Sequence, residues 1–188
     1  MTAPSGRGHA PHEPYGATIL RAAVDPVHDS VTIGRPREEV FAYLADVANH
    51  SEFSDHYLTN WHLTRVDSVG RGAGARFRVG VRFQRFDWGD MTLAVVEPPH
   101  RIVAVGRYGK FNRIKTTAIW TLDAAPGGGT DVEYMIESEP ALPTDKIVEA
   151  LSGQRGYFKR KVRKSLRRLQ AILEENQDRG ARVTVAGL

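Results

Sequence analysis

Residues 144–177 read TDKIVEALSGQRGYFKRKVRKSLRRLQAILEENQ, and their side chains repeat with the period of an α-helix. At about 100° per residue, its mostly apolar side chains fall within roughly a 120° arc of one helix. The members of this stripe are Ile147, Leu151, Phe158, Val162, Ser165, Leu166, Leu169, Ile172 and Leu173. A helix with a single apolar stripe must bury it against another element. The sequence therefore predicts a long amphipathic helix that packs on whatever precedes it.

The expected helix has a start signal and one weak point. Thr144 follows a proline and can cap the first turn through its side-chain oxygen. Gly153 and Gly156 each cost about 1 kcal/mol relative to alanine in a helix interior. Because both glycines lie on the solvent side of the helical wheel, we expect a bend or a short break near them.

A run of strand-like segments, separated by turn residues, precedes this helix. These segments are residues 61–68, 75–86, 91–97, 101–108, 113–122 and 131–137. A further strand at 30–34 opens the domain, and two short helices at 35–47 and 49–58 follow it. The strands are the only large partner for the long helix. We therefore predict an α+β fold in which an antiparallel sheet of six to seven strands wraps around the C-terminal helix.

Several local strings occur in a characteristic order along this set of elements. They are VTI at 31–33, PREEVFAYLAD at 36–46, GRGAGARF at 70–77, EPPHRI at 97–102 and GGTDVEY at 128–134. In order and in wording they resemble the START-like superfamily, also called SRPBCC. Its members include the birch-pollen allergen, lipid-transfer domains and bacterial polyketide cyclases and dehydrases. The resemblance implies a helix-grip fold with a cavity between sheet and terminal helix, but fold alone fixes no reaction.

A length of 188 residues is enough for one domain with a terminal segment on either side. Residues 1–27 lack sustained periodicity and are predicted to be a disordered lead, 28–176 to be the START-like ligand-binding domain, and 177–188 to be a flexible tail. No apolar run approaches the ~18 residues of a membrane span, and no signal-peptide core is present. The chain has no cysteine, which excludes disulfides and thiolate chemistry. A cytoplasmic location is the expectation.

The net charge of +4 has a local origin. Residues 159–168 contain seven basic and no acidic side chains; removing these seven from the 26 basic residues leaves 19, against 22 acidic ones. On the helical wheel the side facing away from the apolar stripe carries Lys159, Arg160, Arg163, Lys164 and Arg167. Such a face can contact an anionic surface weakly or can be plain solvated surface. No nucleic-acid partner is expected.

The strand expected at 75–86 alternates clearly, with Phe77, Val79, Val81 and Phe83 on one side and Arg76, Arg78 and Arg82 on the other. The apolar side should line the cavity and the arginines should face solvent. The predicted ligand-binding residues are Phe77, Val79, Val81, Phe83, Leu93, Trp120, Tyr134, Leu151, Arg155 and Phe158. The alternative interpretation is that the apolar members are ordinary core.

Arg155 interrupts the apolar stripe of the helix. A buried, unpaired guanidinium is costly. Arg155 must therefore extend along the helix edge to water, pair with Glu133 or Glu137, or meet an acidic or carbonyl-bearing ligand.

Strong catalytic or metal motifs are missing from the sequence. There is no GxSxG, HExxH or Walker string, and residues 70–74 sit between two strands as a hairpin turn. His50, His56 and His62 recur every six residues, which matches neither a helix face nor a strand face, so no metal is predicted. His50 or His56 can act as a hydrogen-bonding group at the cavity mouth. No cofactor is expected.

Three functions fit these observations. The first is binding or carriage of a small hydrophobic molecule, lipid or polyketide-like, in the cavity. The second is a polyketide aromatase/cyclase or dehydratase in the same cavity, which needs an acid–base pair near the substrate. Candidates for that pair are His56, Tyr134, Glu137 and Arg155, although no spacing demands it. The third is an interaction protein that acts through the basic helix face.

Overall fold

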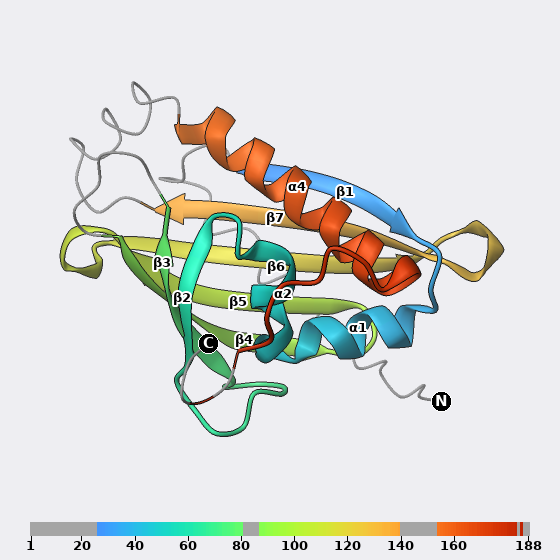
Figure 1. The fold of residues 1–188 in the computed structure, drawn as a ribbon, viewed down its shortest axis with the longest axis horizontal. Helices are drawn as coiled ribbons and strands as arrows, with labels where there is room; N and C mark the ends of the chain where they lie inside the picture. Colours follow the sequence, from blue (N-terminus) through green and yellow to red (C-terminus); the bar gives the residue numbers. More distant parts are fainter. Residues whose placement is uncertain (1–25, 81–86, 140–153, 184, 186–188) are drawn as a thin grey trace, which may run out of the picture.

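The computed structural model describes residues 26–80, 87–139, 154–183 and 185. These residues form one antiparallel sheet of seven strands in the order β1–β7–β6–β5–β4–β3–β2 (Figure 1). The strands are β1 (Val27–Ile33), β2 (Leu58–Leu63), β3 (Gly74–Val79), β4 (Trp88–Glu97), β5 (Arg101–Tyr108), β6 (Ile114–Ala124) and β7 (Thr130–Glu139). The predicted sheet is confirmed, and every pairing is antiparallel.

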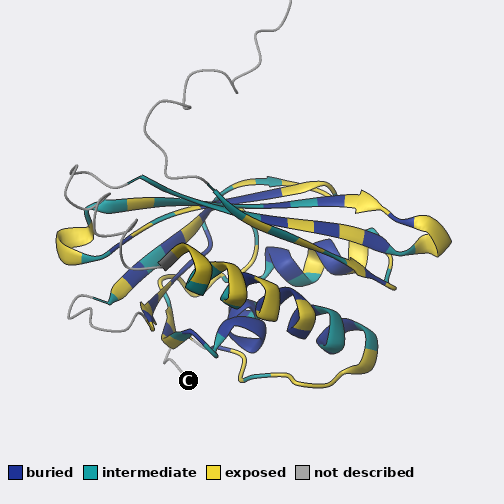
Figure 2. Cartoon of the chain, turned by 90° about the horizontal axis from the view of Figure 1, so that it is seen from above, coloured by how far each residue is buried: buried dark blue, intermediate teal, exposed yellow. Residues whose placement is uncertain are grey.

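The helices lie on one face of the sheet, which curves around them (Figures 1 and 2). Between β1 and β2 come α1 (Arg37–Ala45), a 3₁₀ turn η1 (Val47–Asn49) and α2 (His50–Ser54). Two further 3₁₀ turns, η2 (Lys110–Asn112) and η3 (Pro126–Gly128), connect strands. The long helix α4 (Gln154–Glu175) packs along β1 and α2. This is the predicted helix-grip fold, with two short helices after the first strand.

The two faces of α4 differ as the sequence predicts. Its buried residues include Val162, Leu166, Leu169 and Ile172, and its outward side is exposed (Figure 2). Lys159, Arg160, Arg163, Lys164 and Arg167 are all exposed. The predicted start at Thr144, together with Ile147, Leu151 and Gly153, lies outside the described residues. Helix α4 continues without interruption through Gly156.

The strand β2 lies earlier in the chain than the predicted 61–68, and the second helix ends earlier than predicted. Leu58 already pairs with Val79, so the chain enters the sheet directly after α2 and a short turn. Asn60 has φ 51° and the register with β3 shifts between Thr59 and His62, which bends the strand. Further along, the positive-φ residues Gly70 and Gly72 lie in the predicted turn that leads into β3.

The residues after α4 contact the rest of the domain. The domain boundaries at residues 28 and 176 remain a prediction. Val183 is buried in the core, and its amide donates to the Ala48 carbonyl at 3.1 Å. Residues 178–183 run beside α1 and α2 (Figure 1). Among the described residues, no helix has the length and apolarity to cross a bilayer.

Candidate ligand cavity

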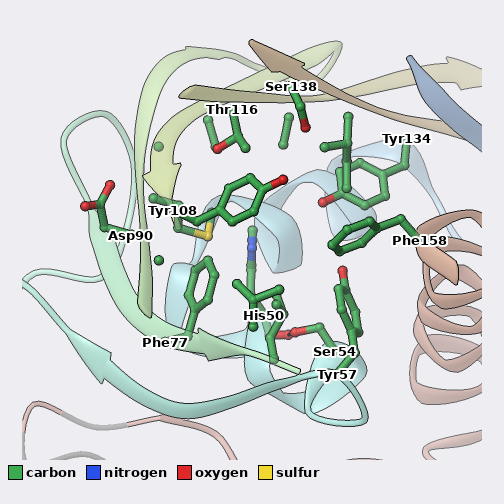
Figure 3. Close-up of a pocket in the computed structure, with 18 of the residues that line it drawn as sticks. His50, Ser54, Tyr57, Phe77, Asp90, Tyr108, Thr116, Tyr134, Ser138 and Phe158 are labelled. Carbon is green, nitrogen blue, oxygen red and sulfur yellow. Dashed lines mark hydrogen bonds between the residues drawn. The ribbon is translucent and has the colours of Figure 1, made fainter. Parts of the chain in front are cut away.

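A cavity lies between the concave face of the sheet, α2 and the first turns of α4 (Figure 3). The volume in which the centre of a water molecule fits without touching the protein is about 130 Å³. Since one water needs roughly 10–15 Å³ on that measure, the space holds on the order of ten waters or a small organic molecule. Most of the lining is apolar, as in small-molecule sites generally.

The space exists because the inward side of the sheet carries small residues at one end. Ala104 of β5 pairs with Ala118 of β6, and both line the cavity together with Gly106 and Thr116. A side chain at Gly106 would collide with the Asp90 carbonyl of β4, so this close approach of the strands requires glycine. At the other end large residues fill the same face: Ile102, Leu122 and Val132 are fully buried.

Aromatic rings form much of the wall. Trp120 stacks on Tyr134 with ring centroids 4.5 Å apart and planes 13° apart. On the other side, Trp61 and Phe77 are in contact at 4.6 Å. Such ring pairs contribute about 0.5–1.5 kcal/mol beyond their buried area. The rings of Trp61, Phe77, Trp120 and Tyr134 therefore give this part of the cavity an aromatic wall.

Tyrosine hydroxyls supply polar groups inside this apolar wall. Figure 3 shows the hydroxyls of Tyr108 and Tyr134, from β5 and β7, pointing toward the space between them. The Tyr134 hydroxyl makes no hydrogen bond with any described residue. Burial raises the pKa of Tyr57 to about 12 and that of Tyr134 well above its usual value of 10. Both hydroxyls therefore stay protonated near neutral pH and can donate to a ligand.

His50 of α2 adds a second kind of polar group. Its Nε2 lies 2.7 Å from the Leu44 carbonyl, and because a carbonyl only accepts, Nε2 carries the proton. Burial lowers the pKa of His50, which favours the neutral ring. In that tautomer Nδ1 is an acceptor. The ring also meets Trp120 edge-on at 5.2 Å, which places it in the aromatic wall.

The predicted ligand-binding residues divide into three groups. Those that line the cavity are Phe77, Val79, Trp120, Tyr134, Arg155 and Phe158. Leu93 is instead fully buried in the core beside the cavity. Val81, Phe83 and Leu151 lie outside the described residues. Arg155 is exposed while lining the cavity, which agrees with a side chain that reaches water at its edge.

The sequence interpretation missed Tyr57, Tyr108 and the small residues that make the space. The alternation of Ala104, Gly106 and Tyr108 in β5 was a usable signal for one inward face. Of the candidate acid–base residues, Tyr134 and Arg155 line the cavity, whereas His56 and Glu137 are not among its lining residues. His56 instead faces α4, where its Nε2 lies 3.3 Å from the Lys161 carbonyl.

The histidines do not form a metal site in the part of the chain that the structure describes. No group of three or more histidine, aspartate or glutamate side chains in that part is arranged to hold an ion. His62 is exposed and its ring contacts the Asn60 carbonyl. The three histidines therefore have separate environments.

Comparison with known proteins agrees with this architecture. The family model of polyketide cyclase/dehydrase and lipid transport proteins matches residues 26–174. The chain belongs to this family, whose members typically bind a hydrophobic ligand or cyclise a polyketide. No curated protein matches the chain.

Solved structures of low sequence identity share the fold. The KanY protein has a TM-score of 0.63 at 17% identity, over 82% of this chain and 99% of that chain. Truncated norcoclaurine synthase from Thalictrum flavum has 0.60 at 11% identity, over 83% and 98%. DynU16, from the dynemicin biosynthetic locus, has 0.56 at 21% identity; the match covers 84% of this chain but 50% of DynU16. At these identities the likeness concerns the fold alone.

Proposed function

We propose that this protein binds and carries a small hydrophobic molecule, lipid or polyketide-like, in the cavity between the sheet and α4. The observation that carries the proposal is the facing pair Ala104 and Ala118, which leaves an aromatic-walled space where a closed core would otherwise form. A flat ring system fits this wall, and a carbonyl or hydroxyl oxygen on it would meet the Tyr134 hydroxyl. Membership of the polyketide cyclase/dehydrase and lipid transport family supports the same proposal.

Binding is favoured over catalysis by the chemistry of the lining. General acid–base catalysis needs a group that gives a proton and one that takes it within reach of the substrate. The raised pKa values of Tyr57 and Tyr134 suit them to donate hydrogen bonds rather than to act as bases. The lowered pKa of His50 makes it a weak base.

The second candidate is a cyclase or dehydratase that uses the same cavity. One observation favours it: the Tyr134 hydroxyl and the neutral imidazole of His50 both belong to the wall. A hydroxyl can polarise a ligand carbonyl while the imidazole accepts a proton, which is the arrangement an aldol-type cyclisation needs. DynU16 comes from a biosynthetic locus and norcoclaurine synthase is named as an enzyme, so the fold is compatible with this role.

Native mass spectrometry of the freshly purified protein tests the binding proposal by looking for a retained small molecule. In parallel, an apolar fluorescent probe such as 1-anilinonaphthalene-8-sulfonate is titrated while tryptophan emission is followed. Trp61 and Trp120 line the cavity, whereas Trp88 is partly exposed on the sheet. We expect saturable quenching that is reduced in Trp120→Phe and kept in Trp88→Phe. Non-saturable quenching, with no retained molecule, contradicts the proposal.

A further inference from the structure

The segment that follows α4 lies outside the stretch matched by the family model, which ends at residue 174. Residues 178–183 nevertheless lie against α1, η1 and α2 (Figure 1). The amide of Gly180 donates to the Glu52 carbonyl at 2.9 Å, and the amide of Val183 donates to the Ala48 carbonyl at 3.1 Å. Together with the buried Val183 side chain, these bonds attach the segment at both ends of its contact.

Charged pairs add to the attachment. Arg179 forms an ion pair with Glu52 at 2.6 Å, and the side chain of Glu52 is only 4% exposed. The same carboxylate accepts a hydrogen bond from the Tyr43 hydroxyl of α1 at 2.6 Å. Arg182 pairs with Asp46 next to η1. A buried carboxylate without its partner is strongly destabilising, so Glu52 depends on Arg179 for its compensation.

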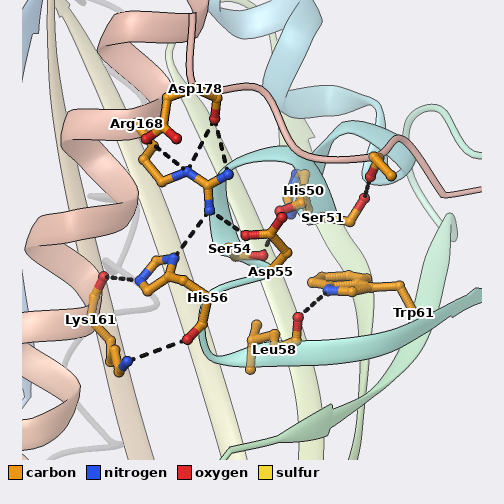
Figure 4. A network of polar contacts seen from close by, with 11 residues as sticks. His50, Ser51, Ser54, Asp55, His56, Leu58, Trp61, Lys161, Arg168 and Asp178 are labelled. Carbon is orange, nitrogen blue, oxygen red and sulfur yellow. Dashed lines mark hydrogen bonds and ion pairs between the residues drawn. The ribbon is translucent and has the colours of Figure 1, made fainter. Parts of the chain in front are cut away.

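Arg168 joins three elements at one point (Figure 4). It projects from α4, its side chain is 9% exposed, and its guanidinium pairs with Asp55 just after α2. Two further guanidinium nitrogens, Nε and Nη2, donate to the Asp178 carbonyl at 3.2 and 2.9 Å. Arg168 therefore connects α4, the end of α2 and the first residue of the segment. A guanidinium this buried is tolerated because each of its sides has a partner.

Helix α2 is the element that the segment holds, and it is also a wall of the cavity. His50, Phe53 and Ser54 of α2 line the cavity, while Glu52 and the adjoining Asp55 meet the segment. A helix of five residues has almost no stability of its own. Its position must come from what packs on either side.

We propose that residues 178–183 are a clasp that fixes α2 as a cavity wall, so that the affinity of the cavity depends on a segment outside the family domain. Arg168, Arg179 and Gly180 act as positioning residues in this clasp. The inference rests on the proposed ligand-binding function, because the clasp acts on the same cavity.

Gly180 offers a sharp test. A β-carbon at this position would lie 2.9 Å from the Glu52 carbonyl oxygen and closer still to the Asp55 carboxylate. Gly180→Val should therefore lift the segment from α2 without changing a cavity residue. If the binding-competent position of α2 falls to about a tenth of the population, the apparent Kd for anilinonaphthalene sulfonate rises about tenfold. The matched control is Ala181→Val, whose side chain is exposed and should leave the Kd unchanged.

Hydrogen exchange followed by mass spectrometry supplies a readout that does not need a ligand. In Gly180→Val, amides in and just after α2, such as those of Asp55 and Tyr57, should exchange faster, while those of β5 and β6 keep their protection. If Gly180→Val does not fold, Arg179→Gln replaces it, since the glutamine amide can still donate a hydrogen bond to the Glu52 carboxylate, which also keeps its bond from Tyr43. We expect the same pattern with a smaller change.

The outcomes separate the two proposals. Faster exchange in α2 without any probe binding by the unaltered protein supports the clasp as a structural device and contradicts the proposed function. Unchanged α2 exchange and unchanged Kd in a folded Gly180→Val protein overturn the clasp and leave the proposed function intact. Exchange that rises equally across the whole sheet also overturns it, because the segment would then stabilise the domain in general.

Discussion

Single residues decide whether the concave face of the sheet is filled or hollow. Ile102 and Leu122 close one end of it, whereas Ala104 and Ala118 leave the other end open. The side chains at the filled end are larger than those at the open end by only a few methylene groups per position. Because protein interiors are otherwise densely packed, these positions control the cavity more directly than its polar groups do.

Filling the space with Ala118→Phe should abolish probe binding. The ring occupies the cavity, and overpacking typically costs about 1–3 kcal/mol of stability. We expect the Kd for anilinonaphthalene sulfonate to rise at least about tenfold, which corresponds to 1.4 kcal/mol. Thr117→Phe is the control, because the adjacent residue of β6 points to the other face of the sheet. Equal loss in both variants would show that the effect is not steric filling of the cavity.

Tyr134→Phe removes one hydroxyl and keeps the ring. Because that hydroxyl has no partner among the described residues, its removal leaves no protein group unsatisfied and should not lower the free energy of unfolding. A ligand whose oxygen accepts a hydrogen bond from this hydroxyl should lose about 0.5–1.5 kcal/mol of binding free energy. We therefore expect weaker binding of 2-acetylnaphthalene and unchanged binding of naphthalene, measured by tryptophan quenching. A similar loss for both probes would argue against a hydrogen bond at this position.

At the scale of elements, α4 keeps its two faces separate. One face packs on the sheet and the other presents Lys159, Arg160, Arg163, Lys164 and Arg167 to solvent. Arg163 has a specific role, because it pairs with Asp29 of β1 at 2.8 Å. The remaining basic residues are available for contact with an anionic surface.

Reversing Arg160, Lys164 and Arg167 to glutamate tests that surface. Since these side chains face away from the cavity, the Kd of the apolar probe should not change. Any electrostatic attraction to anionic vesicles must weaken as salt is added, because the Debye screening length falls to about 8 Å at physiological ionic strength. We expect the unaltered protein to show no salt-sensitive co-sedimentation with phosphatidylserine vesicles. Salt-sensitive binding that the triple variant loses would instead support an interaction role for the basic face.

At the scale of the whole molecule, acid should weaken the contact between α2 and α4. Burial lowers the pKa of His56 to about 4 from its usual value of 6.5. Between about pH 6.5 and pH 4, His56 is protonated in the unfolded chain but neutral in the folded protein. The free energy of unfolding therefore falls as pH decreases through this range. The nearby positive charges of Lys161, Lys164 and Arg168 add to the effect of burial on this pKa, and Figure 4 shows Nδ1 of His56 facing the Arg168 guanidinium.

Urea unfolding of the unaltered protein at pH 7.0 and at pH 4.5 measures this loss. His56→Gln should flatten the pH dependence in part, because His50, whose pKa burial also lowers, contributes with the same sign. His62→Gln, at an exposed position, should leave the dependence unchanged. An identical slope in His56→Gln and the unaltered protein would contradict the assignment.

The order and kind of the elements could be predicted from the sequence, together with the inward side of the strand at 75–86 and of the long helix. These follow from local periodicity: the alternation from Arg76 to Val79 and the helical stripe through Leu169 are readable because each side chain's direction depends on its own stretch of backbone. The resemblance to START-like proteins added the arrangement of helix and sheet. The lining residues Phe77, Trp120 and Phe158 followed from these two sources.

The part of the concave face that stays open, and the contacts that hold the cavity wall, depend on the tertiary structure. Ala104 becomes part of an open space because the register of β5 and β6 sets it beside Ala118. Arg168 meets Asp55 across 113 residues, and Arg179 meets Glu52 across 127, so no local pattern marks either pair. Residues 177–188 are predicted from the sequence to be a flexible tail for the same reason: the partners that neutralise the charges of Arg179 and Arg182 are distant in the chain and adjacent only after folding.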